Sequence, residues 1–231
     1  MLTGIEAVLA EAGLAWSGVD SLILGTTLAT NALIERKGAP TALVTTEGFR
    51  DLVEIGLEDR FAQYDVFLQK PAPLVPRHWR FGIAERVSAA GQVLTPLVEA
   101  DVVLLSERLL AEGIESVAVC FLHGYANPDH ERRVRDLLRR HAPGLRVSLA
   151  SDVCPEIREY ERMSTAVVNG YLGPVMQRYI DRLQQRLHDL GLGATPQLTQ
   201  SNGGVIGFET AARLPVRTVL SGPSTGVVAA Q

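Results

Sequence analysis

The sequence predicts an α/β fold built around a parallel or mixed sheet. Short apolar strands, such as 21–25 and 41–44, alternate with helix-sized segments, and helical connections between apolar strands are typical of parallel βαβ units. Polar, glycine-rich junctions follow three of the predicted strands, at 25–31, 200–204 and 221–226. Because an open α/β sheet binds its ligands beyond the ends of its strands, these junctions indicate a small-molecule site.

The chain is expected to open with an amphipathic helix, followed by a strand–helix–strand unit. The opening helix ends near Gly13 and carries one apolar stripe: Ile5, Val8, Leu9 and Ala12. The unit then comprises the strand 21–25, a helix from about Ala29 to Lys37, and the strand 41–44, with turn residues at Gly38 and Pro40.

Residues 47–97 interrupt this alternation and are interpreted as an insertion or small subdomain. The segment 70–76 contains three prolines, each of which fixes its own φ and disfavours helix at the preceding residue. Beyond it, 80–87 and 92–94 flank a turn at Gly91 and predict an antiparallel hairpin.

The second half of the chain returns to alternating helices and strands. Helices are expected at 98–111, 157–190 and 210–213, and the second of these should have a joint near Gly173-Pro174. A further helix should follow Asn127, which would cap it, with Pro128 in its first turn. Strands are expected at 117–122, 146–149, 197–199 and 216–220. A helix of small residues should begin within 221–231.

Composition excludes several classes of protein. The 231 residues are 46% hydrophobic and 21% charged, with a net charge of −4, as in an ordinary globular protein with no basic patch for nucleic acid. The arginines between 132 and 140 suit the solvent-facing side of one helix. No apolar run is long enough to cross a membrane, and the amino terminus lacks a signal-peptide pattern. With two separate cysteines, Cys120 and Cys154, a cytoplasmic protein is expected.

Three other patterns favour structural interpretations. Gly222–Gly226 matches G-x-S-x-G, but a nucleophile elbow needs its acid and histidine later in the chain, where only five residues remain. His123 and His130 do not have the spacing of metal ligands on one helix, so His130 and Glu131 are placed in a first helical turn and no metal site is expected. Glu159 and Arg162, three residues apart, are expected to form a surface ion pair; an acid held beside a substrate is the less favoured alternative.

The glycine-rich junctions leave two alternatives open. Gly, Asn and Ser dominate ordinary turns, so each junction alone is better explained as turn chemistry. If the three junctions lie together at the strand ends of one parallel sheet, however, a binding role is about as well favoured as turn chemistry.

The sequence resembles the hydantoinase A/5-oxoprolinase family, which includes the β subunits of acetone-type carboxylases. The matching stretches run in order through nearly the whole chain: GTTLATNALIERKGAPTALVTTEGFRDLVEIG at 25–56, CFLHGYANPDHE at 120–131, EIREYERMSTAVVNGYL at 156–172, QSNGG at 200–204 and SGPSTGVVAA at 221–230. No single motif carries the resemblance, but their combination is highly specific.

The resemblance implies an actin-like ATPase (ribonuclease-H-like) fold, with nucleotide held in a cleft between two α/β lobes. It also implies ATP- and Mg²⁺-dependent opening of a cyclic amide, such as hydantoin or 5-oxoproline, through phosphorylation of its carbonyl oxygen. The substrate would be bound by neutral polar groups: Thr26, Thr27, Asn31, Ser201, Asn202 and Gly203. The nucleotide would be approached by three glycines: Gly25, Gly222 and Gly226. No catalytic residue is assigned.

By the same resemblance, residues 1–220 would be the amino-terminal lobe, and 221–231 the start of the hydantoinase A domain. The family's two phosphate loops, the first of the form D-x-G-G-T-x-x-D, are not found in these residues, and Ser224-Thr225 replaces the usual Ala-Gly. The isolated chain is therefore expected to be an incomplete lobe, inactive and without bound nucleotide. Because strand edges and apolar surface would be exposed, it should be marginally stable or self-associate. In the whole protein, its partner would be a B-type hydantoinase subunit or domain. The alternatives are a ketone-carboxylase β-type subunit and a non-catalytic partner-binding remnant.

Overall fold

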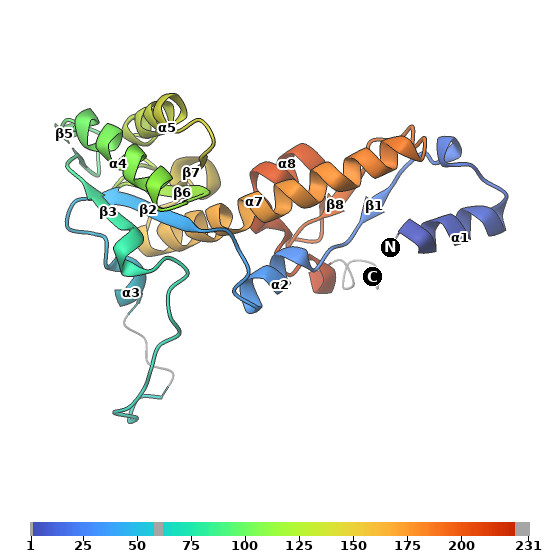
Figure 1. Ribbon diagram of the computed structural model, residues 1–231. Coiled ribbons are helices and arrows are strands. Elements are labelled where there is room, and N and C mark those ends of the chain that lie inside the picture. The colour runs from blue at the N-terminus through green and yellow to red at the C-terminus, as the bar shows by residue number, and fades with distance from the viewer. Residues whose placement is uncertain (1, 58–61, 225–231) are drawn as a thin grey trace. The chain divides into compact units, whose positions relative to one another are not determined.

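A computed structural model describes residues 2–57 and 62–224 (Figure 1). The chain divides into two compact units. Unit 1 combines the residues up to Lys37 with those from Val175 onward, and unit 2 comprises Gly38–Pro174. This division does not coincide with the boundary expected at residue 220, which stays a prediction about the family's domains.

Unit 2 contains a four-stranded parallel sheet in the order β3-β2-β6-β7. The strands are β2 (Thr41–Thr46), β3 (Arg80–Ile83), β6 (Ser116–Cys120) and β7 (Arg146–Leu149). In the register, Leu43 lies opposite Arg80 on one side and Ala118 on the other. Every residue of β2 and β6 is buried, as expected for central strands that are covered on both faces.

Helices cover both faces of this sheet, giving a three-layer α/β/α unit (Figure 1). On one face, α4 (Glu99–Ala111) and α5 (Asp129–His141) pack Val102, Leu109 and Leu138 against Val44 and Val119. On the other face, α6 (Ala150–Val153) and the first half of α7 (Glu159–Asp189) pack against alternate strand residues. The expectation of an α/β fold with a parallel sheet is confirmed for this unit.

The segment 47–97 contributes more to the sheet than an insertion would. It contains α3 (Leu52–Ile55), η2 (Arg77–Trp79) and the edge strand β3. The predicted hairpin over 80–87 and 92–94 is thus only partly correct. Because the first residues of that stretch pair with β2, only β4 (Arg86–Val87) remains to pair antiparallel with β5 (Val93–Thr95).

Unit 1 contains a smaller mixed sheet in the order β1-β8-β9. β1 (Ile23–Leu24) runs parallel to β8 (Gln197–Thr199), which pairs antiparallel with β9 (Val205–Gly207). The expectation that the strands at 21–25 and 41–44 belong to one βαβ unit is therefore wrong, since β1 and β2 lie in different sheets. A two-residue strand pairs with whichever strand edge the tertiary fold places beside it. Here that edge belongs to β8, which lies far along the chain.

The helices of unit 1 follow the predicted pattern at most positions. They are α1 (Leu2–Ala12), η1 (Trp16–Gly18), α2 (Leu28–Ile34), the second half of α7, α8 (Phe208–Arg213) and η3 (Pro215–Thr218). None of the residues of α1 is buried, so its apolar stripe is not part of the buried core of the described residues. None of the described helices is long and apolar enough to cross a membrane.

The strand predicted at 216–220 is instead the 3₁₀ helix η3, which corrects the sequence-based assignment. Pro215 supplies the φ that starts a helical turn. The hydroxyl of Thr218 donates to the carbonyl of Pro215 at 2.8 Å and closes that turn. Local hydrogen bonds therefore hold this segment in a helical turn, although its apolar residues predicted a strand.

Candidate functional site

The first junction lies at the carboxyl end of the parallel pair β1–β8 in unit 1. Leu24 pairs with Leu198, so Gly25 follows directly beside Thr199. A Cβ placed on Gly25 would lie 3.8 Å from the Thr199 hydroxyl. That hydroxyl is buried, and it has no hydrogen-bond partner within the described ranges 2–57 and 62–224. The end of the sheet thus holds a buried polar atom whose hydrogen-bonding capacity is unused within these ranges.

Two threonines and an asparagine form the start of α2. The Thr26 hydroxyl oxygen accepts from the Leu28 amide at 3.2 Å, and the Thr27 oxygen accepts from the Asn31 side-chain amide at 3.3 Å. Thr27 and Asn31 are exposed, and Thr26 is half-buried. Because both hydroxyl oxygens act as acceptors in these bonds, their protons remain available to donate to a ligand.

The second junction is a hairpin turn between β8 and β9. The Gln200 amide donates to the Gly204 carbonyl at 2.9 Å, and Gly203 adopts φ +84°, which favours glycine. The side-chain oxygen of Asn202 accepts from the Gly204 amide at 3.0 Å. The turn-chemistry explanation accounts fully for these contacts.

Hydrogen bonds join all three junctions within unit 1. The Ser201 hydroxyl lies 2.7 Å from the carbonyl oxygen of Arg217 and 2.5 Å from that of Val219, and it donates its single proton toward them. The Ser224 hydroxyl donates to the Ser201 carbonyl at 2.6 Å. The Leu220 amide donates to the Thr30 hydroxyl oxygen at 3.0 Å. The third junction is thereby linked to the second through Ser224, and Leu220, the residue just before the third junction, is linked to the first.

The third junction is also the most strained part of this cluster. Leu220 has φ +59°, a left-handed conformation that is rare for a bulky residue and that local contacts must hold in place. Gly222 is exposed, and no heavy atom lies within 4 Å of a Cβ built on it. Gly226, the remaining predicted nucleotide contact, lies outside the described residues.

The sequence pattern missed three residues of this cluster: Thr30, Thr199 and Ser224. Thr30 and Ser224 stand inside the quoted junction motifs, so a signal was available, but their side-chain partners are 190 and 23 residues away. Thr199 ends a strand and carries no distinguishing motif. The use of Ser224 as a donor to backbone carbonyls agrees with a structural rather than nucleophilic role.

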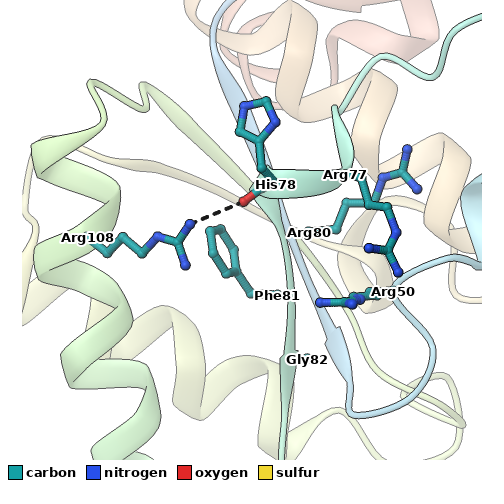
Figure 2. Close-up of a pocket in the computed structure, with 7 residues that line it drawn as sticks. All are labelled: Arg50, Arg77, His78, Arg80, Phe81, Gly82 and Arg108. Atoms are coloured by element: carbon teal, nitrogen blue, oxygen red, sulfur yellow. Dashed lines mark hydrogen bonds between the residues drawn. The ribbon is translucent and has the colours of Figure 1, made fainter.

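Unit 2 contains an arginine-lined cavity of about 590 Å³ that no sequence motif predicted (Figure 2). It opens around β3, where Phe81 and Gly82 form part of its wall. The remaining lining residues are cationic or aromatic: Arg50, Arg77, His78, Arg80 and Arg108. The arginines come from three separate segments, around Arg50, around Arg77 and Arg80, and around Arg108, which explains why they form no pattern in the sequence.

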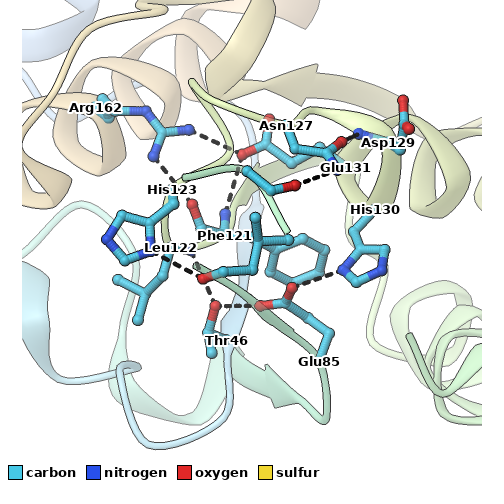
Figure 3. Close-up of polar contacts among 12 residues, drawn as sticks. Thr46, Glu85, Phe121, Leu122, His123, Asn127, Asp129, His130, Glu131 and Arg162 are labelled. Atoms are coloured by element: carbon cyan, nitrogen blue, oxygen red, sulfur yellow. Dashed lines mark hydrogen bonds and ion pairs between the residues drawn. The ribbon is translucent and has the colours of Figure 1, made fainter. Parts of the chain in front are cut away.

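A buried ion pair lies beneath the loop after β6 (Figure 3). Arg162 donates to Glu131 at 3.1 Å and to the Phe121 carbonyl at 3.0 Å, and both ionic side chains are at most 1% exposed. Glu131 also accepts the amides of Phe121 and Ser151. Burial raises the pKa of Glu131, while Arg162 and the amide donors act in the opposite direction. The predicted surface pair of Glu159 with Arg162 is therefore wrong, because Arg162 turns inward toward α5.

The two histidines of this region also have structural partners. His130 Nδ1 lies 2.8 Å from the buried carboxylate of Glu85, which also accepts from Thr46 (Figure 3). His123 Nδ1 donates to the Val87 carbonyl at 2.9 Å. Among the described residues, no group of three or more His, Cys, Asp or Glu side chains is placed to hold a metal. His130 and Glu131 do occupy the first turn of α5, as predicted.

The model of the hydantoinase/oxoprolinase N-terminal region matches residues 1–142, and the hydantoinase/oxoprolinase model matches residues 162–231. The chain belongs to the hydantoinase/oxoprolinase family. The resemblance drawn from its motifs is therefore confirmed.

Several members of the hydantoinase/oxoprolinase family align with most of this chain. The α subunit of caprolactamase from Pseudomonas jessenii is 37% identical over 208 residues, covering 89% of this chain and 30% of that protein. The 5-oxoprolinase of Saccharomyces cerevisiae is 32% identical over 237 residues, covering 92% and 18%. The β subunit of acetone carboxylase from Xanthobacter autotrophicus is 28% identical over 219 residues, covering 87% and 29%. The chain thus spans a third or less of these relatives.

Solved structures within the hydantoinase/oxoprolinase family share the fold. The ATP-dependent caprolactamase of Pseudomonas jessenii matches with a TM-score of 0.88 and 35% identity, over 96% of this chain and 33% of that one. The nucleotide-free acetone carboxylase matches with a TM-score of 0.85 and 26% identity, with the same coverage. The predicted α/β fold class is confirmed, and its parallel and mixed sheets are consistent with an actin-like lobe.

Proposed function

We propose that this chain is the substrate-positioning part of an ATP-dependent enzyme that opens a cyclic amide. Its support is membership in the hydantoinase/oxoprolinase family, whose relatives include a caprolactamase and a 5-oxoprolinase. The observation that carries the proposal is the hydrogen-bonded cluster of three junctions at the end of the β1–β8 pair. This cluster presents neutral donors and acceptors where an α/β sheet binds ligands.

The proposed chemistry makes a resonance-stabilised amide carbon electrophilic. The carbonyl oxygen attacks the γ-phosphorus of ATP, and ADP leaves with the electron pair of the broken P–O bond. Water then adds to the activated carbon. Loss of phosphate and cleavage of the C–N bond give the ring-opened amino acid. Mg²⁺ would neutralise charge on the transferred phosphoryl group, and this chain's residues would orient the substrate.

Different roles are proposed for the residues of the cluster. Thr26 and Thr27 would donate their hydroxyl protons to the substrate, and Asn31 would accept or donate beside them. Ser201 directs its proton into the fold, so it would act by positioning the turn that contains Asn202 and Gly203. Three glycines would allow the backbone to come close to the nucleotide: Gly25, Gly222 and Gly226.

A second candidate function is ATP-dependent carboxylation of a ketone. It is favoured by the similarity to the acetone carboxylase β subunit and its nucleotide-free structure. The same neutral site would then orient a ketone whose enolate oxygen accepts the phosphoryl group. For the cyclic-amide enzyme, the partner would be a B-type hydantoinase subunit or domain. The third alternative is a non-catalytic module that binds such a subunit.

The 231 residues alone are proposed to be inactive, with no bound nucleotide. Micromolar affinity requires about 8 kcal/mol, whereas one helix N-terminus supplies about 0.3–1 kcal/mol. The described cluster would contribute to the free energy of nucleotide binding only through neutral polar groups. The isolated chain, expected in the cytoplasm, would also self-associate through the edge of β1, where Ile23 is 52% exposed.

The test measures phosphate release from Mg-ATP by a full-length protein containing this segment. Stimulation by 5-oxoproline, hydantoin or caprolactam supports the hydrolase. Stimulation only by acetone or acetophenone with bicarbonate supports the carboxylase, and no stimulation supports the non-catalytic module. In the active enzyme, Thr26→Val should lower kcat/KM about tenfold. The control Thr3→Val, at an exposed position of α1, should leave it unchanged.

An equal effect of the two threonine variants would count against the assigned site. Calorimetry with Mg-ATP separately tests the isolated chain. Tight binding by the 231 residues would show that the nucleotide site is misplaced in this proposal. Analytical ultracentrifugation tests self-association, which a strictly monomeric species would contradict.

A further inference from the structure

The cavity around β3 in unit 2 has a markedly cationic wall. Four of its lining residues are arginines, and none of the described lining residues is acidic. Figure 2 shows the side chains of Arg50, Arg77 and Arg108 arranged around the strand that carries Phe81 and Gly82. Its volume of about 590 Å³ lies within the range of small-molecule sites.

Arg77 and Asp51 form a bidentate pair at the rim of the cavity. Arg77 Nε lies 2.9 Å from Oδ1 of Asp51, and Nη2 lies 2.9 Å from Oδ2. The hydrogen bonds from Arg77 hold the pKa of Asp51 below its ordinary value, so this carboxylate is ionised near neutral pH. The negative charge of Asp51 is therefore already matched by one guanidinium.

Arg50 adds a positive charge that this carboxylate does not match. Its Nε lies 3.9 Å from Oδ2 of Asp51, beyond hydrogen-bonding distance, and its side chain is 49% exposed. The guanidinium of Arg50 therefore keeps donors that can reach a ligand in the cavity.

The other two arginines are held in place by their surroundings. Arg80 is buried and bonds to Glu54 at 2.7 Å and to the Val75 carbonyl at 3.0 Å. Arg108 bonds to Glu112 at 2.7 Å, and its guanidinium carbon lies 4.8 Å from the centre of the Phe81 ring. Within the described part of the chain, three carboxylates thus lie within 4.0 Å of four guanidinium groups: Asp51, Glu54 and Glu112. One positive charge remains in excess.

We propose that this cavity binds a small dianion, with Arg50 as the main ligand-binding residue and Arg77 on the same side of β3. The ligand class is one with two or more anionic oxygens, either a phosphate or a dicarboxylate. The planar fork of arginine pairs bidentately with both groups, and fixed neighbours reduce the ordering cost of binding. Every residue of this site belongs to unit 2, whereas the three junctions belong to unit 1, so the inference does not rest on the proposed amide chemistry.

Calorimetric titration of the 231-residue chain with sodium phosphate and, separately, sodium malonate tests this inference. Ionic strength is held constant with sodium chloride, so that only specific dianion binding is measured. The variant is Arg50→Gln. The matched control is Arg132→Gln, because Arg132 is 54% exposed and makes a similarly weak pair at 3.7 Å, with Asp129 on α5.

Saturable binding of at least one dianion is expected, with affinity about tenfold weaker in Arg50→Gln and unchanged in Arg132→Gln. Binding of phosphate alone or malonate alone supports the site and identifies its class. Circular dichroism checks that both variants remain folded. The absence of saturable binding for both dianions, or an equal loss of affinity in the two variants, would overturn the inference.

Discussion

Glu131 on α5 and Arg162 on α7 form a buried ion pair, with Oε1 and Nη2 3.1 Å apart. The pair also fixes backbone on both sides of it, because Arg162 bonds to the Phe121 carbonyl and Glu131 accepts the Ser151 amide. It therefore joins the end of β6 to the start of α6 and to α7. Removing either charge leaves the other one buried without its main partner.

Replacing Arg162 with methionine should destabilise unit 2 by about 3–5 kcal/mol, because Glu131 keeps its buried position and loses its counter-charge. Urea denaturation followed by far-ultraviolet circular dichroism measures the change. The control Arg132→Met removes an exposed charge and should change stability by at most about 0.5 kcal/mol. Similar losses in the two variants would contradict a special role for the buried pair.

Gly124→Ala should disturb the same ion pair by steric overlap. A Cβ at this position would overlap the Glu131 carboxylate and lie 2.8 Å from Nη2 of Arg162. Overpacking of this kind costs about 1–3 kcal/mol. Gly144→Ala is the matched control, since no heavy atom lies within 4 Å of a Cβ there. Thermal unfolding measures the stability of both variants. Equal stability of Gly124→Ala and Gly144→Ala would refute this prediction.

Acid should weaken the contact between α4 and α5 at Glu99 and Arg133. The two side chains form bidentate bonds of 2.7 Å, and the hydrogen bonds from Arg133 hold the pKa of Glu99 below its usual 4.5. A carboxyl whose folded pKa is lowered stabilises the protein above its unfolded pKa. This contribution is lost as the pH falls through the folded value.

Arg133→Gln should accordingly be less stable than the wild type at pH 7 and should approach it below pH 4.5. Urea midpoints measured from pH 7 to about pH 3 follow the difference. The effect should be small and should shrink further in high salt, because the pair is exposed at the surface. A difference that stays constant with pH would exclude this linkage.

Cys120 should be protected from alkylation in the folded protein. Its side chain lies in the core of unit 2, and burial raises the pKa of its thiol well above the ordinary range. In a Cys154→Ser variant, iodoacetamide at pH 8 should react roughly a hundredfold more slowly with native than with urea-unfolded protein. A Cys120→Ala variant, which retains the half-buried Cys154, is the comparison. Equal native rates in the two variants would show that Cys120 is accessible.

Local patterns in the sequence predicted most of the elements in unit 2. The apolar runs at 41–44, 117–122 and 146–149 became β2, β6 and β7, because buried parallel strands need continuous apolar residues. Predictions failed where the partner of a segment decides its structure. Residues 80–83 joined β2, and 216–218 closed on themselves as part of η3.

The candidate sites show the same limit more strongly. The junction motifs identified Thr26, Thr27 and Ser201, but the bond from Leu220 to Thr30 spans 190 residues and has no local signal. The arginine cavity is assembled from segments between Arg50 and Arg108 that share no spacing. The inward turn of Arg162 was missed, because helical spacing alone placed it beside Glu159.

The sequence by itself determined the fold class, the family and the identity of the polar junctions, since these depend on residue types and on short-range order along the chain. The tertiary structure decided which strands share a sheet, which charges are buried and which distant residues meet. Those outcomes depend on how the chain packs within each unit, because burial removes water and strongly favours pairing between buried polar groups. Chain order does not specify which distant groups those will be.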